Sequence, residues 1–183
     1  TDPVWWFYLF WLPRYLQSTF HLSLSQNRLP LVMVYLIGTV GSVGGGWISS
    51  ALLNRGRSLN VSRKTALLVC ALCVVPVFFA PYVHSLWSVV ALVGLAAAAH
   101  QGWSANLFTL PSDMFPRSAV ASVIGIGGMA GACGGFLLQL ATGRIVKLTN
   151  SYVPLFVFAC VAYLGSLLII HFITPKLAPA QIE

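Results

Sequence analysis

The feature that most constrains this chain is its series of long apolar runs, each close to the roughly 20 residues that a helix needs to cross a bilayer. The runs cover, approximately, residues 3–20, 30–53, 65–83, 85–110, 119–142 and 153–174. Only 7% of the residues are charged, whereas a soluble domain carries about 25%, so a soluble globular enzyme is excluded. The predicted fold class is an all-α membrane protein with six transmembrane helices. The short connections predict that consecutive helices are antiparallel neighbours.

The basic residues predict which side of the membrane each loop occupies. In a soluble chain the net charge of +7 would suggest nucleic acid, but basic residues between apolar runs report orientation, and we expect no nucleic-acid partner. The loops on one side hold Arg55, Arg57, Arg63, Lys64, Arg117 and Lys176. The loops on the other side hold Arg28, Arg144 and Lys147. The positive-inside rule places the first set and both chain ends in the cytoplasm, as in a multi-pass protein of a bacterial inner membrane.

The first apolar run is short for a membrane span. Trp11, Arg14 and Tyr15 form a group typical of a membrane interface. Only about eleven residues precede that group, and a helix of this length covers about 16 Å, half of the hydrocarbon core. We therefore expect the helix to begin upstream of residue 1, so that the chain is a fragment cut inside its first helix. Asp2 would then lie within the membrane.

Glycine and polar residues divide the runs into two similar sets of three. Most of the 16 glycines lie in the second and fifth runs, where spacings of four residues let helix backbones approach closely. These ridges consist of Gly41 with Gly45, and of Gly127 with Gly131 and Gly135. The first and fourth runs carry the unusual polar and aromatic residues, and the third and sixth runs are almost uniformly apolar, which suits contact with lipid. The order polar, glycine-rich, apolar therefore occurs twice along the chain. It predicts two three-helix repeats, as in many secondary transporters.

One stretch of the fifth run, from Gly125 to Ala130, satisfies a loose dinucleotide-binding pattern. No strand precedes this stretch, and it lies in the middle of a predicted span, whereas a dinucleotide fingerprint needs a strand followed by a helix. We therefore expect no cofactor and no metal.

Four segments of the chain carry a resemblance to one transporter family. Residues 45–58, with the sequence GGWISSALLNRGRS, are similar to the glycine-aspartate-arginine loop of that family, with Ser50 where the wider family often has an aspartate. Residues 2–13, 100–116 and 125–131 look like the hexuronate transporter subgroup. The chain as a whole resembles the C-terminal half of the anion:cation symporter family of the major facilitator superfamily.

The resemblance implies a twelve-helix transporter of which residues 1–183 are helices seven to twelve. Its partners would be a missing N-terminal six-helix half, the lipid bilayer, a small sugar acid and a proton. The resemblance also implies proton-coupled uptake of galacturonate or glucuronate by alternating access. In that fold the seventh and tenth helices line the central cavity, and the eighth and eleventh helices pack against the other half. A related porter for aldonates or aldarates is the alternative.

Several residues of the first and fourth runs suit a uronate, which needs a cation, amide or hydroxyl partners and aromatic faces. The candidate substrate-binding residues are Gln101, Trp103, Ser104, Asn106, Trp6 and Arg14. Helical spacing places Asn106 well away from Gln101, so these side chains cannot all face one ligand. The alternatives are interhelical hydrogen bonds for the residues of the fourth run and snorkelling to the outer surface for Arg14.

Three further titratable residues have predicted roles. Asp2 is the candidate proton carrier, because a carboxylate within a bilayer is costly unless it is paired, protonated or placed in a watery cavity. Asp113, four residues before Arg117, is expected to pair locally or to cap a helix end. His171 is expected to be an interfacial group rather than a proton relay.

Two alternatives to a half-transporter fragment stay open. One is a six-helix intramembrane serine protease, which would need a serine such as Ser42 next to a histidine such as His100. The other is a self-contained half-transporter that acts as a dimer. Nothing orients His100 in the sequence, and we therefore predict a transporter and no enzyme activity.

Overall fold

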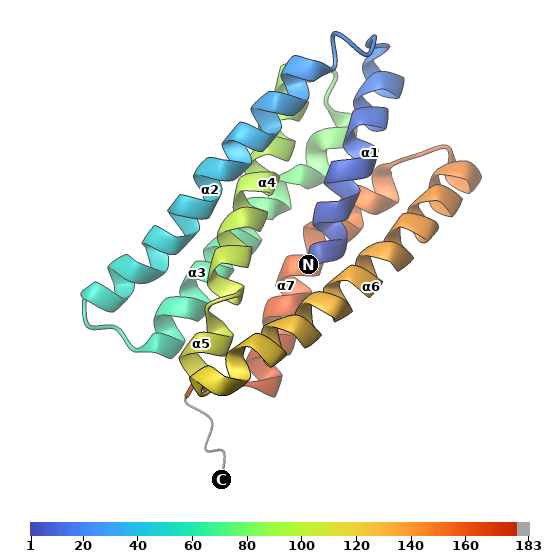
Figure 1. The fold of residues 1–183 in the computed structure, drawn as a ribbon. Coiled ribbons are helices and arrows are strands. Elements are labelled where there is room, and N and C mark those ends of the chain that lie inside the picture. Colours follow the sequence, from blue (N-terminus) through green and yellow to red (C-terminus); the bar gives the residue numbers. More distant parts are fainter. Residues whose placement is uncertain (179–183) are drawn as a thin grey trace.

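The computed structural model describes residues 1–178, and Glu183, to which the sequence assigns no role, lies outside that part of the chain. The elements are α1 (Asp2–Phe20), α2 (Arg28–Asn54), α3 (Leu59–Val74), the 3-10 helix η1 (Val75–Tyr82), α4 (Leu86–Leu107), α5 (Leu110–Met114), α6 (Arg117–Thr149) and α7 (Val153–Ile173). Residues 1–178 contain no strand and form a bundle of long helices (Figure 1). The predicted all-α fold is confirmed.

Local sequence signals account for several helix boundaries. Ser58 caps α3, where its side chain accepts a hydrogen bond from the backbone N–H of Val61. Pro76 and Pro81 lack a backbone N–H, and the chain between them continues α3 as the 3-10 helix η1. Asn150 ends α6 in the left-handed conformation, which asparagine tolerates better than most residues. The boundaries therefore follow from short-range chemistry.

The membrane spans agree with the apolar runs, with two differences. Five helical segments within residues 1–178 are long and apolar enough to cross a membrane, and α1 is a further helix of 19 residues. α6 extends to Thr149, beyond the predicted end at residue 142. The fourth run is divided into α4 and the short α5, whose second residue is Pro111. In Figure 1, α1 starts alongside the middle of α6 rather than at its end.

The helices pair across the chain rather than only in sequence order. α2 packs mainly on α4, and α1 packs on α6, whereas α1 has few contacts with α2, and α6 has few with α7. The expectation that consecutive helices are neighbours is therefore wrong for those two connections and for α4 with α6, although it holds for α2 with α3 and for α3 with α4. Each glycine-rich helix packs on the polar helix of the other set of three, so the two sets are interlocked, as two related repeats would be.

The ridge glycines Gly41, Gly45, Gly131 and Gly135 face other helices of the bundle, whereas Gly127 is exposed and has no atom within 4 Å of its Cβ position. Gly41 and Gly45 lie against the backbone of Ala98 and Gly102 on α4, so closely that a Cβ atom on either glycine would overlap it. This ridge therefore packs within the chain. The faces of α2 and α6 that remain exposed are apolar instead, with Val43 and Trp47 on α2 and Ile126 and Leu137 on α6.

Candidate functional site

A hollow that is open to the surface lies between α1 and α6, because side chains, rather than backbone, face the glycines of α6. The side chain of Asp2 lies against Gly131, and a Cβ atom on Gly135 would lie 3.0 Å from the indole of Trp6. Farther along α6, Gly143 faces the indole of Trp11. The glycines thus admit large side chains between two helices, and the space that these leave is a pocket of about 460 Å³.

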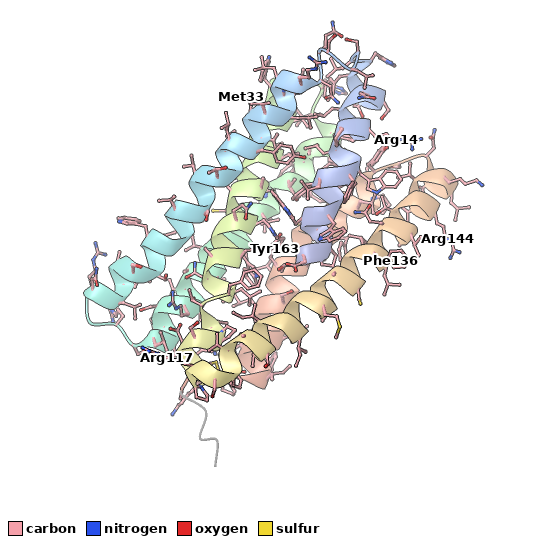
Figure 2. The ribbon with its side chains drawn as sticks, in the orientation of Figure 1. Arg14, Met33, Arg117, Phe136, Arg144 and Tyr163 are labelled. Atoms are coloured by element: carbon pink, nitrogen blue, oxygen red, sulfur yellow. The ribbon has the colours of Figure 1, made fainter. Side chains whose placement is uncertain are left out.

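The pocket combines one cation, one amide and several aromatic faces. Its lining residues are Trp6, Phe10, Trp11, Arg14, Phe136 and Gln139. Figure 2 labels Arg14 and Phe136, which come from α1 and α6 respectively. The exposed guanidinium of Arg14 lies 5.7 Å from the centroid of the Trp11 ring, at cation–π distance. Such a lining suits an anion with a C–H surface.

The side-chain amide of Gln139 is held in place by Trp11. The indole Nε1 of Trp11 donates a hydrogen bond to Oε1 of Gln139, which fixes the orientation of both groups. The Nε2 group of Gln139 is buried and has no hydrogen-bond partner within residues 1–178. A buried donor without a partner is costly.

Asp2 lies at the same helix pair but lines a different cavity. This second cavity has a volume of about 380 Å³, and α4, α5 and α6 supply most of its walls, including Leu107, Met114 and Val123. Asp2 is half-buried and forms no ion pair with any other described residue.

The middle of α4 forms a buried cluster with α1 and α7. His100 Nδ1 is hydrogen-bonded to the hydroxyl of Tyr163, and His100 Nε2 lies 3.3 Å from the hydroxyl of Ser104. The ring of Trp5 stacks on His100 with the centroids 4.9 Å apart. Trp103 is fully buried with its edge against Tyr163, and Figure 2 shows Tyr163 in the interior of the bundle. Trp103 and Ser104 therefore lie outside the pocket.

The two amides of α4 also lie away from the pocket. Asn106 is buried, and its Nδ2 donates hydrogen bonds of 2.9 Å to the backbone oxygens of Gly45 and Gly102. This geometry matches the alternative of an interhelical hydrogen bond. Gln101 is half-buried, and no described residue bonds its side chain. Of the predicted substrate-binding residues, the pocket thus contains only Trp6 and Arg14.

Asp113 pairs with a distant residue, which corrects the expectation of local pairing with Arg117. The Nε group of Arg63 donates to Oδ2 of Asp113 at 2.8 Å, and Nη1 of the same guanidinium donates to the hydroxyl of Ser49 at 3.0 Å. Arg117 is exposed. The pairing differs because α3 and α5 meet at this end of the bundle, and no local spacing reveals that approach. The three residues tie α2, α3 and α5 together.

The serine and histidine that a protease would require are not paired. Ser42 is exposed on α2. Both ring nitrogens of His100 lie against Tyr163 and Ser104. Neither contact supplies the base-to-nucleophile geometry of a serine hydrolase at Ser42.

Gln139, Phe136 and Phe10 are the pocket residues that the sequence analysis did not identify. A signal for Gln139 was present, because it follows Gly131 and Gly135 at steps of four residues and therefore shares their helix face. It is also an amide within an apolar run, which is unusual inside a membrane. The two phenylalanines carry no comparable signal, since phenylalanine is common on lipid-facing surfaces.

Comparison with known proteins places the chain in a broader context. Residues 3–139 match the Major Facilitator Superfamily. The chain is 31% identical to the hexuronate transporter of Escherichia coli K12 over 92% of its own length and 39% of that protein. It is 29% identical to a probable galactarate/D-glucarate transporter of the same strain, over 80% of the chain and 32% of that protein.

A third relative is the D-galactonate transporter of Escherichia coli O6:H1, which is 26% identical over 88% of the chain and 37% of that protein. The chain spans between 32% and 39% of the length of these three relatives.

Proposed function

Because this chain belongs to the Major Facilitator Superfamily, we propose that its pocket between α1 and α6 binds a hexuronate, galacturonate or glucuronate, during uptake across the bacterial inner membrane. The superfamily resemblance seen in the sequence is confirmed. The three relatives are transporters of sugar acids by name, and this shared chemistry supports a sugar-acid transporter rather than an enzyme. An aldonate or aldarate porter is the second candidate, since two of the relatives carry such substrates in their names.

The observation that carries the proposal is that Arg14 of α1 and Gln139 of α6 line the same aromatic pocket. A guanidinium binds a carboxylate with charge-assisted, often bidentate hydrogen bonds. The side-chain amide of Gln139 lines the same pocket and suits a sugar hydroxyl, and the indoles of Trp6 and Trp11 suit the C–H face of the ring. The three parts of a uronate thus each have a matching group.

The residues of α4 enter the proposal through conformational change. Alternating access rocks helices against one another around a central site, and such a motion would change which α4 side chains face the substrate. Gln101 and Ser104 are half-buried and are the α4 residues closest to this role. Trp103 and Asn106 are fully buried and would need a larger rearrangement, so for them we favour packing between helices.

The proposal includes a second six-helix half and a cytoplasmic C-terminus. A chain of this length corresponds to about a third of the relatives, and residues 1–183 would supply helices seven to twelve. The basic residues after α2, near the start of α3 and at the start of α6 support the cytoplasmic placement of that end of the bundle.

The pocket assignment is tested by uptake of labelled galacturonate into cells that express the full-length protein carrying Arg14→Gln. Loss of a charge-assisted bond costs about 1.5–3 kcal/mol, so we expect the apparent affinity to fall by about tenfold or more. Arg144→Gln is the matched control, because Arg144 is exposed on α6 outside the pocket. Uptake by the Arg14 variant equal to that of the unmodified protein would show that the pocket does not bind the substrate during transport. Competition with unlabelled galactonate and galactarate separates the two candidate substrate classes.

Proton coupling is proposed at Asp2, because its half-buried carboxylate has no cationic partner among the described residues. In Asp2→Asn, exchange of substrate across the membrane should persist, while accumulation driven by a pH gradient should be lost. The two assays use the same proteoliposomes, so folding is controlled internally. Normal accumulation by this variant would exclude Asp2 as the proton carrier.

A further inference from the structure

A groove between α3 and α7 lies on the outer surface of the bundle, away from the pocket. It has a volume of about 360 Å³, and its walls are Asn60, Val61, Lys64, Thr65, Leu68, Leu167, Leu168 and His171. α3 and α7 lie side by side at the end of the bundle nearest the C-terminus (Figure 1). The groove is therefore open to the lipid or solvent that surrounds these two apolar helices.

Polar groups gather at one end of the groove. Lys64 Nζ donates to the backbone oxygens of Thr174 and Pro175 at 2.7 and 2.8 Å, and its third N–H direction lies toward His171 Nδ1 at 3.4 Å. Oδ1 of Asn60 accepts a hydrogen bond from the backbone N–H of Leu177, which leaves the Nδ2 donors of this amide unused by that bond. One ammonium, one imidazole and one amide thus converge.

The positive charge of Lys64 has no counter-charge nearby among residues 1–178. The acidic side chains within residues 1–178 are Asp2, which lies at the α1–α6 interface, and Asp113, which pairs with Arg63. The partners of Lys64 are backbone oxygens, which orient the ammonium without neutralising it. An anion at this end of the groove would therefore complete the site electrostatically.

The rest of the groove is aliphatic. Leu68 and Leu168 are 42% and 56% exposed, and they continue from the polar end along α3 and α7 toward the middle of the spans. Lys64 lies in the second turn of α3, and His171 lies in the last turn of α7. In a membrane these two residues lie at the depth of the lipid headgroups, and the leucines lie at the depth of the acyl chains.

We propose that this groove binds an acidic phospholipid. The ammonium of Lys64 attracts its phosphate by charge, the phosphate accepts hydrogen bonds from His171 and Asn60, and one acyl chain lies along Leu68 and Leu168. The amphipathic lining selects a lipid over a free phosphate, because a free anion would leave the aliphatic part of the groove unused. Basic pockets between helices at the membrane surface bind acidic headgroups on the same electrostatic principle.

The test is native mass spectrometry of the full-length protein in neutral detergent, titrated with dioleoyl phosphatidylglycerol or dioleoyl phosphatidylcholine. We expect a preference for phosphatidylglycerol in the unmodified protein. Lys64→Gln keeps a donor for the backbone oxygens of α7 but removes the charge, and should reduce this preference about fivefold, the effect of about 1 kcal/mol for one cation near a membrane surface. Lys64→Arg should retain the preference. Comparison of the two variants separates the effect of the charge from the effect of the hydrogen bonds to the backbone oxygens of Thr174 and Pro175.

Arg57→Gln is the matched control, since Arg57 is an exposed cation at the same end of the bundle but outside the groove. An equal loss in this control, or an unchanged preference in Lys64→Gln, would overturn the proposal. Leu168→Ser should weaken both lipids alike, because it alters only the acyl-chain part of the groove. Displacement of phosphatidylglycerol by inorganic phosphate alone would show a simple anion site and would equally exclude a lipid site.

Discussion

The interface between α2 and α4 and the interface between α1 and α6 are built from the same residue type with opposite results. On α2, Gly41 and Gly45 face the backbone of α4 at Ala98 and Gly102. On α6, Gly131 and Gly135 face the side chains of Asp2 and Trp6 on α1. The first interface is closed by direct backbone contact, whereas the second opens into a pocket of about 460 Å³.

The difference shows that a glycine ridge allows another group to approach the helix closely, but does not specify whether that group is a backbone or a side chain. Where small residues lie opposite the ridge, the helices touch, and a polar group such as Asn106 spans the contact with hydrogen bonds to both helices. Where large residues lie opposite, the absent Cβ atoms make room for an indole and a carboxylate. The first interface therefore has a structural role, and the proposed substrate site lies at the second.

The largest effect is expected for Gly45→Leu. The new side chain would overlap the backbone of Gly102, and backbone cannot move aside as a side chain can. Overpacking of this kind costs about 1–3 kcal/mol or more, so we expect most of the folded protein to be lost, as measured by the monodisperse fraction in size-exclusion chromatography. Gly44→Leu is the control on the same helix, because no atom lies within 4 Å of its Cβ position. Equal yields of the two variants would contradict the closed-interface interpretation.

A smaller effect is expected for Asn106→Leu. This change removes two hydrogen bonds of 2.9 Å, one to Gly45 of α2 and one to Gly102 of its own helix. Interhelical hydrogen bonds in membranes average about 0.6 kcal/mol, so we expect a lower Tm with an unchanged Kd for the sugar acid. A normal Tm together with a higher Kd for the sugar acid would indicate that Asn106 binds the substrate.

The smallest effect on stability is expected for Gly135→Ala. A methyl group here would lie 3.0 Å from the ring of Trp6, and this side chain can shift by a few tenths of an ångström. The protein should remain folded, but the displaced indole should weaken sugar-acid binding severalfold, as measured by isothermal titration. Gly128→Ala is the matched change on the open part of α6, where nothing lies within 4 Å. If both alanine variants bind equally well, Trp6 is not a wall of the substrate site.

The sequence by itself determined the class of protein, the positions of the long helices and the two sets of three. Hydropathy and proline, asparagine and serine signals act over one or two turns, so they can be read directly from residues such as Ser58 and Asn150. The same local information identified Arg14 and Trp6, because a cation and an indole are unusual near a span.

Only the tertiary structure decided which helix faces meet. It placed the ridge of α2 on α4, joined Asp113 to Arg63 across 50 positions of the chain, and brought Gln139 to Trp11. Trp103 carries every property of a sugar-stacking residue, yet it packs against Tyr163 in the interior. The physical reason is that apolar helices are interchangeable in their local chemistry. Their pairing depends on the shape of the opposing surface, which no segment of the sequence contains alone.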